Sequence, residues 1–495
     1  MFHRPIPLSA ALVAAMLPLA AGAQQMTAKD AWDSLRALAA DNGLAITAQG
    51  VSDFGTAIEA RGVHIFPADE PNAMVIGMAD LRVEPRGDLV ALIPSETVTL
   101  DMLSGSVARS FEIHQTGEIR GNLTEDNAAL DLSFGAFSVR LMSSNRRGAP
   151  LGEAINVDLS GLDGSMRATR DGSADVTLGF AGARYAYTLP EGFPGSEGAV
   201  TASGAMDAMH MEFSGTELDM LGALEDTPGA LRAAFDAGFH ARLSMTTEGG
   251  QGSSSQILQG AALSMDTQSG PSTMTLNIAD GRFDLEMDAA AAQFSGDFAG
   301  VSGQFSMDGM GVNMGGPLVV TPDSQPVRYA FHLDNALPSP ELLAMVNAGD
   351  FAGESLSLAL DLRADARLTE ELGPDFGDGR TPPFDVDQVL LDQLLLRVGD
   401  SEFTGSGAAT LIGGLAGQMR QGMPDANGDF TFDLVGGQRL LDRLTALGLV
   451  PQDQLFFVRM MMNGLGQPVG EDHLRSEVAL RPGGAITVNG APLPF

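Results

Sequence analysis

The stretch that decides the fold is SLSLALDLRADARL, residues 355–368. Leu or Ala occupies every second position from Leu356 to Leu368, and Ser, Asp and Arg fill most of the positions between them. Successive side chains of a β-strand point to opposite faces of a sheet, so a period of two puts one face in a core and the other in water. The stretch therefore predicts a long, half-buried strand.

The same alternation recurs along the chain, at Val98, Leu100 and Met102; Ile155, Val157 and Leu159; Met274, Leu276 and Ile278; and Phe283, Leu285 and Met287. Dipeptides typical of tight turns separate such stretches, among them Asp171-Gly172, Asp280-Gly281 and Asn427-Gly428. We expect a mainly β (α+β) protein. Its predicted architecture is an elongated antiparallel sheet or groove with a short N-terminal helix, interspersed helices and a C-terminal helical hairpin.

Helical signals interrupt the strands. Thr27 and Asp30 form a capping-box-like pair, and Trp32 and Leu35 follow at helical spacing, which predicts a helix near 27–42 covering one end of a sheet. Further helices are expected near 216–238, after the N-cap Ser339, and as a hairpin near 438–463. The hairpin is expected to pack onto the last strands through Leu440, Leu441, Leu444, Leu447, Phe456 and Met460.

The first residues carry an export signal. Residues 6–20 are almost wholly apolar, follow Arg4, and lead into Ala21-Gly22-Ala23, whose small residues fit a signal-peptidase site. The alternative is an uncleaved anchor, but the apolar run is shorter than the roughly 20 residues that span hydrocarbon. We expect residues 1–23 to be a signal peptide cleaved after Ala23, a periplasmic location, and no integral membrane segment afterwards.

The remaining chain divides into two expected parts. These are an N-terminal β-rich region, 24–250, which holds the helices near 27–42 and 216–238, and a C-terminal β-rich region, 251–495, which holds the hairpin. Candidate boundaries are the Gly/Ser-rich segment 249–255 and the Gly, Asp and Pro of 373–383. Either segment could equally be a long hairpin loop.

Composition excludes several functions. The 495 residues include 63 acidic and 28 basic side chains, for a net charge of −35, and Lys29 is the sole Lys. Binding to a polyphosphate backbone needs clustered Lys and Arg, so we expect no nucleic acid partner. The chain has no Cys, which excludes disulfides, Cys-ligated metals and a Cys nucleophile.

No motif assigns a catalytic or metal-binding role. The closest pair among the seven His, His210 and His240, is 30 residues apart, and neither a G-x-S-x-G elbow nor a P-loop occurs. The glycines around Met310 are interpreted as turns. Asp425, Asn427 and Asp429 could offer oxygen ligands to calcium, but a tight turn explains them more simply. We therefore predict a non-enzyme without catalytic, cofactor-binding or metal residues, no cofactor, and ligand-binding residues that the sequence does not identify.

Both ends of the chain resemble a known family. The residues that carry the resemblance are Trp32, Gly43, residues 50–55 and the strand 56–65, then Leu440-Leu441-Asp442, Leu444, Gly448-Leu449, Met460-Met461, residues 486–490 and Pro492-Leu493. Together they resemble the domain-of-unknown-function 2125 family of Gram-negative envelope proteins, which is distantly similar to AsmA-like envelope proteins. The resemblance implies an envelope location and elongated β-sheets with apolar grooves associated with lipid handling, and it supplies no catalytic residues. This chain departs from AsmA-like proteins in its cleavable signal.

Two functional hypotheses follow. The first is a non-enzymatic periplasmic envelope protein that binds lipid or another apolar ligand in a β-sheet groove, because alternating strands occur together with 25 Met residues, whose side chains adapt to varied apolar surfaces. Met could equally fill a closed core. The second is a periplasmic structural or assembly factor that acts through protein–protein contacts. The expected partner is accordingly lipid or an envelope protein, and the oligomeric state is open.

Overall fold

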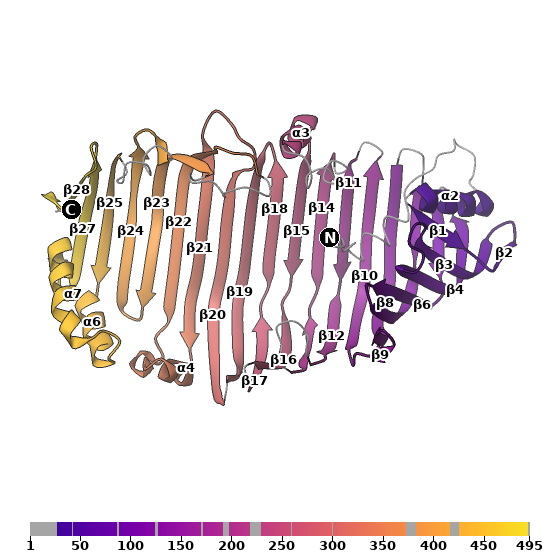
Figure 1. Ribbon diagram of the computed structural model, residues 1–495, viewed down its shortest axis with the longest axis horizontal. Coiled ribbons are helices and arrows are strands. Elements are labelled where there is room, and N and C mark those ends of the chain that lie inside the picture. Colours follow the sequence, from indigo (N-terminus) through magenta and orange to yellow (C-terminus); the bar gives the residue numbers. More distant parts are fainter. Residues whose placement is uncertain are drawn as a thin grey trace. The chain divides into compact units, whose positions relative to one another are not determined.

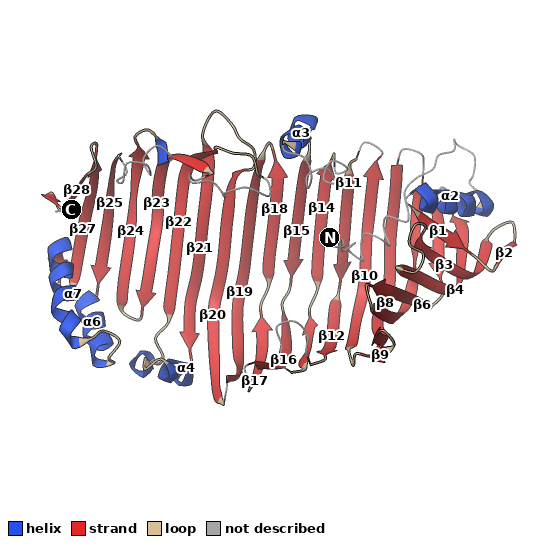
Figure 2. Cartoon of the chain, viewed as in Figure 1, coloured by secondary structure: helices blue, strands red, loops and turns tan. Residues whose placement is uncertain are grey.

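The computed structural model describes residues 27–493 except 42, 87–88, 124–126, 170–171, 192–197, 218–228, 259, 299, 373–382 and 416–424. The chain is mainly β, with 67% strand and 13% helix, which confirms the expected fold class (Figures 1 and 2). The expected signal peptide, part of the helix predicted near 216–238 and most of the candidate boundary at 373–383 lie outside the described residues. Two compact units are found, Met1–Leu218 with Leu243–Ser264 (unit 1) and Asp219–Arg242 with Met265–Phe495 (unit 2).

The described part of unit 1 begins with one helix and continues in strands. Its elements are α2 (Ala28–Asp41), β1 (Leu44–Thr47), β2 (Gly50–Asp53), β3 (Ile58–Pro67), β4 (Met74–Arg86), β5 (Leu89–Pro94), β6 (Thr97–Ser104), β7 (Val107–Leu123), β8 (Asn127–Arg146), β9 (Ala149–Pro150), β10 (Ala154–Thr169), β11 (Ala174–Phe180), β12 (Gly182–Leu189), β13 (Val200–Met206), β14 (Met209–Thr216) and β16 (Gly250–Leu258). The chain passes between the units at β15 (His240–Thr247) and β17 (Ala261–Ser269).

Long strands of unit 1 each pair with two shorter ones. β4 pairs with β6 through its first half and with β5 through its second half. β7 then pairs with both β6 and β5 on one edge and with β8 on the other. β10 likewise pairs with β8 along one edge, and with β12 and β11 in turn along the other. All these pairs are antiparallel. Side chains alternate between the two faces along each strand, and directly opposed residues share a face, so the sequence pattern shows which side chains lie together on each face.

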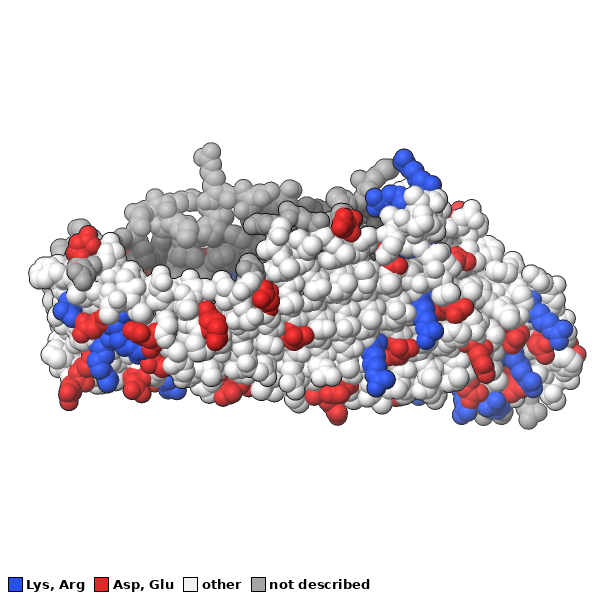
Figure 3. Space-filling model, turned by 90° about the horizontal axis from the view of Figure 1, so that it is seen from below, with Lys and Arg blue, Asp and Glu red and all other residues white. Residues whose placement is uncertain are grey.

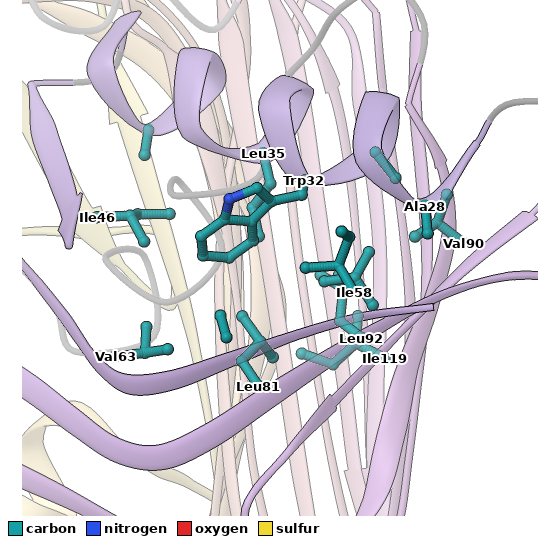
Figure 4. Packing of buried hydrophobic residues seen from close by; sticks show 14 of the residues in the cluster. Ala28, Trp32, Leu35, Ile46, Ile58, Val63, Leu81, Val90, Leu92 and Ile119 are labelled. Carbon is teal, nitrogen blue, oxygen red and sulfur yellow. The ribbon is translucent and has the colours of Figure 1, made fainter. Parts of the chain in front are cut away.

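The helix α2 closes the first strands of unit 1. The Asp30 N–H donates to Thr27 Oγ1 (3.1 Å) and the Thr27 N–H donates to Asp30 Oδ2 (3.2 Å), which is the reciprocal cap expected from the sequence. Trp32 and Leu35 point from the helix toward the strands, where they pack with Ile58 and Leu81 in one buried cluster (Figure 4). This end of unit 1 therefore has two layers and a closed core.

Unit 2 is a run of long strands with short helices. Its elements are α3 (Ala230–Ala237), β18 (Ser272–Ala279), β19 (Arg282–Phe298), β20 (Val301–Pro317), β21 (Gln325–Pro338), α4 (Pro340–Met345), a 3₁₀ turn at Gly349–Phe351, β22 (Leu356–Leu368), β23 (Phe384–Val398), β24 (Ser401–Leu411), β25 (Ala426–Val435), α6 (Gly437–Ala446), α7 (Gln452–Leu465), β26 (Gln467–Gly470), β27 (His473–Arg481), β28 (Ala485–Val488) and β29 (Ala491–Pro492). From β18 to β25 each strand pairs antiparallel with the next in the chain. The stretch 355–368 forms β22, as its alternation predicts.

Two expected turns are wrong. Asn427 and Gly428 lie inside β25, and the glycines around Met310 lie inside β20. The reason at Gly428 is close strand contact, since a Cβ there would come 2.2 Å from the Ala408 carbonyl oxygen. Glycine is used here to let backbones approach, which a sequence alone does not distinguish from a turn.

The C-terminal helical hairpin forms, but part of its expected packing is wrong. Leu441 is buried, whereas Phe456 is 76% and Met460 52% exposed. The half-buried apolar residues of α7 are Leu455, Val458 and Met462, spaced by three and four positions. This stripe, and not the one through Phe456 and Met460, faces the rest of unit 2.

Candidate apolar ligand-binding sites

One face of unit 2 is apolar across its strands. Directly opposed residues of paired strands share a face, so the register defines rows of neighbouring side chains. One row crosses β18 to β23 through Leu276, Leu285, Met314, Tyr329, Leu362 and Leu391. The next row runs through Met274, Met287, Val312, Phe331, Leu360 and Leu394.

Apart from Leu391, which is buried, these side chains are only partly removed from solvent. Phe331, Leu360 and Leu394 are half-buried, and Leu396, which extends the same face, is 41% exposed. α4 packs against β20, α6 against β24, and α7 against β26 and β27. Within the described part of unit 2, no helix is drawn across the middle of β19 to β23 (Figure 2). Among the described residues, then, no helix covers the middle of this apolar face.

The opposite face of unit 2 carries paired charges. Arg328 bonds Asp361 on the neighbouring strand (2.9 Å), and Arg363 bonds Asp392 on the next. These contacts hold the pKa of the Asp392 carboxyl below its usual range, chiefly through hydrogen bonds from Arg363. In the view from below in Figure 3, which takes in the described parts of both units, basic and acidic side chains lie beside one another. The two faces of the unit 2 strands thus differ sharply in chemistry.

Phenylalanine rings cover glycines on the apolar face near the end of the chain. Phe432 lies directly opposite Gly405, and Phe430 opposite Gly407. The rings of Phe403 and Phe430 both stack with that of Phe432, with centroids 5.8 and 6.4 Å away. A Cβ at Gly405 would come within 2.5 Å of Phe432, so the missing side chain gives the ring its place. The glycines of β24 thus leave room for the phenylalanine rings of β25 on the apolar face.

Unit 1 holds an apolar cavity of about 120 Å³ between α2 and the strands. Leu35, Leu81 and Phe134, which belong to the cluster beneath α2, line one part of it, and Ile76 and Ile113 from a second buried cluster line another. The remaining lining residues are Ile46, Ile65, Met78, Leu92, Pro94, Val98, Gln115, Ile119 and Phe137. The cavity is therefore lined by residues of two hydrophobic clusters, and Gln115 is its one polar lining residue.

That polar side chain is Gln115 of β7, which is 4% exposed. Its Nε2 donates to the carbonyl oxygens of Pro94 (3.0 Å) and Ser95 (2.9 Å). Its Oε1 is buried and has no hydrogen-bond partner among the described residues. Gln115 was not identified from the sequence, although it stands with Gly117 between Ile113 and Ile119, where the alternation calls for apolar side chains.

A second pocket of about 290 Å³, lined by both polar and apolar side chains, adjoins this position. Gln115 and Phe137 line both spaces. The other lining residues of the second pocket are Glu96, His114, Thr116, Ala136, Ser138, Asp158 and Leu159. Gln115 thus stands at the boundary between an apolar space and an acidic one.

Arg109 and Glu153 of unit 1 form a largely buried ion pair that lines neither pocket. Arg109 donates to both carboxylate oxygens of Glu153 (2.7 and 2.8 Å), and Ser144 Oγ donates to Glu153 Oε2. The hydrogen bonds from Arg109 lower the pKa of Glu153, against the opposing effect of burial. Both carboxylate oxygens of Glu153 accept hydrogen bonds, so this side chain holds β7 and β8 to the segment that follows β9. This arrangement does not favour a role in proton transfer.

The polar residues considered in the sequence are dispersed. Asp429 pairs with Arg481, and Asp425 accepts a hydrogen bond from the Gly483 N–H. His473 bonds Asp433, while His210 bonds Glu212. Among the described residues, no group of three or more His, Asp or Glu could hold a metal ion, and no helix is long and apolar enough to cross a membrane.

Comparison with known proteins identifies neither a family nor a function for this chain. No protein-family model matches the chain, and no curated protein matches it. The resemblance to the domain-of-unknown-function 2125 family therefore stays a prediction.

Proposed function

We propose that this protein is a non-enzymatic periplasmic protein of the cell envelope that binds lipid or another apolar ligand along the apolar face of its strands. The observation that carries the proposal is the run of large apolar side chains in register from β18 to β23, most of which remain partly exposed in unit 2. Water-soluble proteins rarely leave contiguous apolar surface of this kind unless it binds something. The cavity of unit 1 supports the same function.

Charge indicates how the ligand is collected. A net charge of −35 discourages adsorption to anionic membrane surfaces. The protein should therefore receive its ligand from a partner protein or through brief membrane contact, and not by coating a bilayer.

Two adjacent leucines of β23 test the proposal. Leu396 lies on the apolar face opposite Leu358, whereas Leu395 lies on the other face opposite Ala359. A photo-crosslinking amino acid at position 396 should capture lipid in native envelope preparations, and the same amino acid at position 395 should not. Mass spectrometry of the crosslinked protein measures the difference. Equal labelling at both positions, or none at either, would contradict binding on this face.

A second candidate function rests on a different surface. α7 exposes Phe456, Phe457, Met460 and Met461, and these side chains suit contact with another protein. This surface favours the structural or assembly role. Purification from an envelope fraction, followed by lipid mass spectrometry and crosslinking, separates the two functions. Co-purifying lipid supports the first, and a lipid-free protein with one stoichiometric protein partner supports the second.

A further inference from the structure

Methionine is the most readily oxidised kind of side chain in this protein. The chain has 25 Met and no Cys, so no thiol competes for a mild oxidant such as a peroxide. The thioether sulfur takes up one oxygen atom and becomes a sulfoxide, which is polar where methionine is apolar. The oxidant must reach the sulfur, so exposure decides which of these methionines react.

Two exposed methionines lie on the apolar face of unit 2. Met287 of β19 lies directly opposite Val312 and is 43% exposed. Met310 of β20 lies opposite Leu333 on the same face and is 38% exposed. Met307, in the same strand as Met310, is only 9% exposed. A peroxide in solution therefore has access to two sulfurs of this face and little access to the buried one.

Met287 and Met310 are neighbours across the pair of strands β19 and β20. Since Met287 opposes Val312, Met310 stands two positions along β20 from the direct partner of Met287. Residues in this diagonal relation lie about 7–8 Å apart, within reach of long side chains. Met274 of β18 opposes Met287 on the other side, so one patch holds three thioethers. An apolar ligand lying across β18 to β20 would contact this patch.

A sulfoxide at these positions changes what the face can bind. Its oxygen accepts hydrogen bonds, and water provides them while the face is empty. An apolar ligand displaces this water and brings no donor, and burying a polar group without a hydrogen bond is costly. The neighbouring side chains of Leu285, Val312 and Phe331 offer no donor either. Oxidation should therefore oppose the binding of an apolar ligand.

The bound state should in turn protect the sulfurs. A ligand that covers the patch lowers the exposure of Met287 and Met310, so a loaded protein reacts more slowly than an empty one. Oxidation then acts chiefly on protein that has not yet taken up its ligand. The strands themselves should tolerate the change, because both side chains already lie partly in solvent.

We propose that Met287 and Met310 form a reversible oxidation site that switches off apolar binding on the unit 2 face. In the reaction with hydrogen peroxide the O–O bond breaks, the sulfur loses two electrons and gains one oxygen atom, and the other oxygen leaves as water. A methionine sulfoxide reductase reverses the step with a dithiol, which is oxidised to a disulfide while the oxygen leaves as water. The inference rests on the proposed function, because it assumes that this face binds an apolar ligand, and it adds a modification that regulates the same site.

Mass spectrometry of peptides from the peroxide-treated, full-length protein tests the site. Met287 and Met310 should be oxidised about tenfold faster than Met307, because their sulfurs are exposed. The apolar fluorescent probe diphenylhexatriene, added before the peroxide, should slow the reaction at the two exposed positions. Equal rates at all three methionines would overturn the inference.

The fluorescence of diphenylhexatriene measures the effect on binding. Oxidised wild-type protein should bind the probe about tenfold more weakly than untreated protein, and treatment with methionine sulfoxide reductases and dithiothreitol should restore binding. The double variant Met287→Leu, Met310→Leu keeps the face apolar at nearly the same volume, so peroxide should change its affinity by less than about twofold. The matched control is Met142→Leu with Met460→Leu, which removes two methionines that are exposed outside this face and should lose binding as wild type does.

The outcomes separate the inference from the proposed function. If oxidised wild type keeps its affinity, or if the double variant loses as much affinity as wild type, the inference is wrong, while binding by untreated protein still supports the proposed function. No binding by untreated protein would overturn the inference as well, and crosslinking at position 396 judges the proposed function separately. If the double variant does not fold, the wild-type time course decides, because loss of binding must follow sulfoxide formation at Met287 and Met310 and must be reversed by the reductases.

Discussion

The α2 end of unit 1 and the strands β18–β25 of unit 2 use the same two-residue alternation with different results. In unit 1 the helix α2 covers the apolar face, and its Trp32 is buried together with Ile58 and Val63 of β3. In unit 2 the corresponding face keeps residues such as Met287 and Leu396 about two-fifths exposed. Alternation therefore specifies which side chains share a face, and the presence of a second layer decides whether that face is a core.

Burying a charge should separate the two regions most strongly. Val63→Asp places an unpaired carboxylate in the closed core of unit 1, so it should cost about 4 kcal/mol or more in free energy of unfolding. Val389→Asp, on the half-buried apolar face of β23, should cost only about 1–2 kcal/mol because the carboxylate keeps water. Chemical denaturation followed by circular dichroism measures both. Equal losses would mean that the unit 2 face is covered in solution.

The helical hairpin allows a buried apolar side chain to be compared with an exposed one within unit 2. Leu441→Asp should destabilise by about 3 kcal/mol, because Leu441 is buried where α6 packs on the sheet. Phe456→Asp should change the free energy of unfolding by less than about 0.5 kcal/mol, because its ring lies in solvent. Thermal melts of the two variants provide the comparison. A large loss in Phe456→Asp would place the exposed face of α7 in a protein interface.

Adding a side chain to a strand glycine tests how tightly the apolar face of unit 2 is filled. Gly405→Val should cost about 1–3 kcal/mol, because the new Cβ would displace the Phe432 ring. The control is Gly50→Val in β2 of unit 1, where a Cβ meets nothing within 4 Å and the melting temperature should hardly move. A tolerated Gly405→Val would show that the phenylalanine rings reorient freely.

Lowering the pH should destabilise the protein more through the buried ion pair of Glu153 in unit 1 than through the exposed ion pair of Asp392 in unit 2. Hydrogen bonds from Arg109 lower the pKa of Glu153 in the folded protein. The ionised Glu153 therefore adds its full contribution to the free energy of unfolding above its ordinary pKa of 4.5, and this contribution is lost as the pH falls through the lower pKa of the folded state. Glu153→Gln should flatten the pH dependence of unfolding in that range, even in high salt. Asp392→Asn, beside Arg363, should have a smaller effect that salt suppresses. Salt sensitivity at Glu153 would contradict its burial.

The sequence predicted the strands well because their apolar faces are continuous. The stretch 355–368 became β22, and the cap of Thr27 with Asp30 formed as expected. Met side chains occur in two environments, since Met166 and Met307 are buried while Met287 and Met310 lie partly exposed on the strands, and a role of the exposed ones in ligand binding stays a prediction. What alternation could not reveal was whether a second layer covers a face, because that depends on contacts between distant segments.

The candidate site was harder to predict for a related reason. Gln115 interrupts an apolar series, but a single polar residue in a strand is ordinary until its neighbours show that it is buried with an unpaired oxygen. The stripe of α7 was misjudged because several apolar residues are consecutive there, so helical spacing allows more than one buried face. Strand glycines such as Gly428 were mistaken for turns because close backbone approach leaves no separate signal.

The pairing of every strand from β18 to β25 with its chain neighbour has a consequence for folding and for evolution. Contacts of this kind are short in sequence, so each hairpin can form before the next, and low contact order favours rapid folding. The stability of such a sheet is then approximately a sum over the contacts between neighbouring strands, as it is over neighbouring repeats in repeat proteins. Duplication or loss of one hairpin would lengthen or shorten the apolar surface by two strands without altering the topology of the others. The reach of this surface can thus be adjusted in steps of a single hairpin.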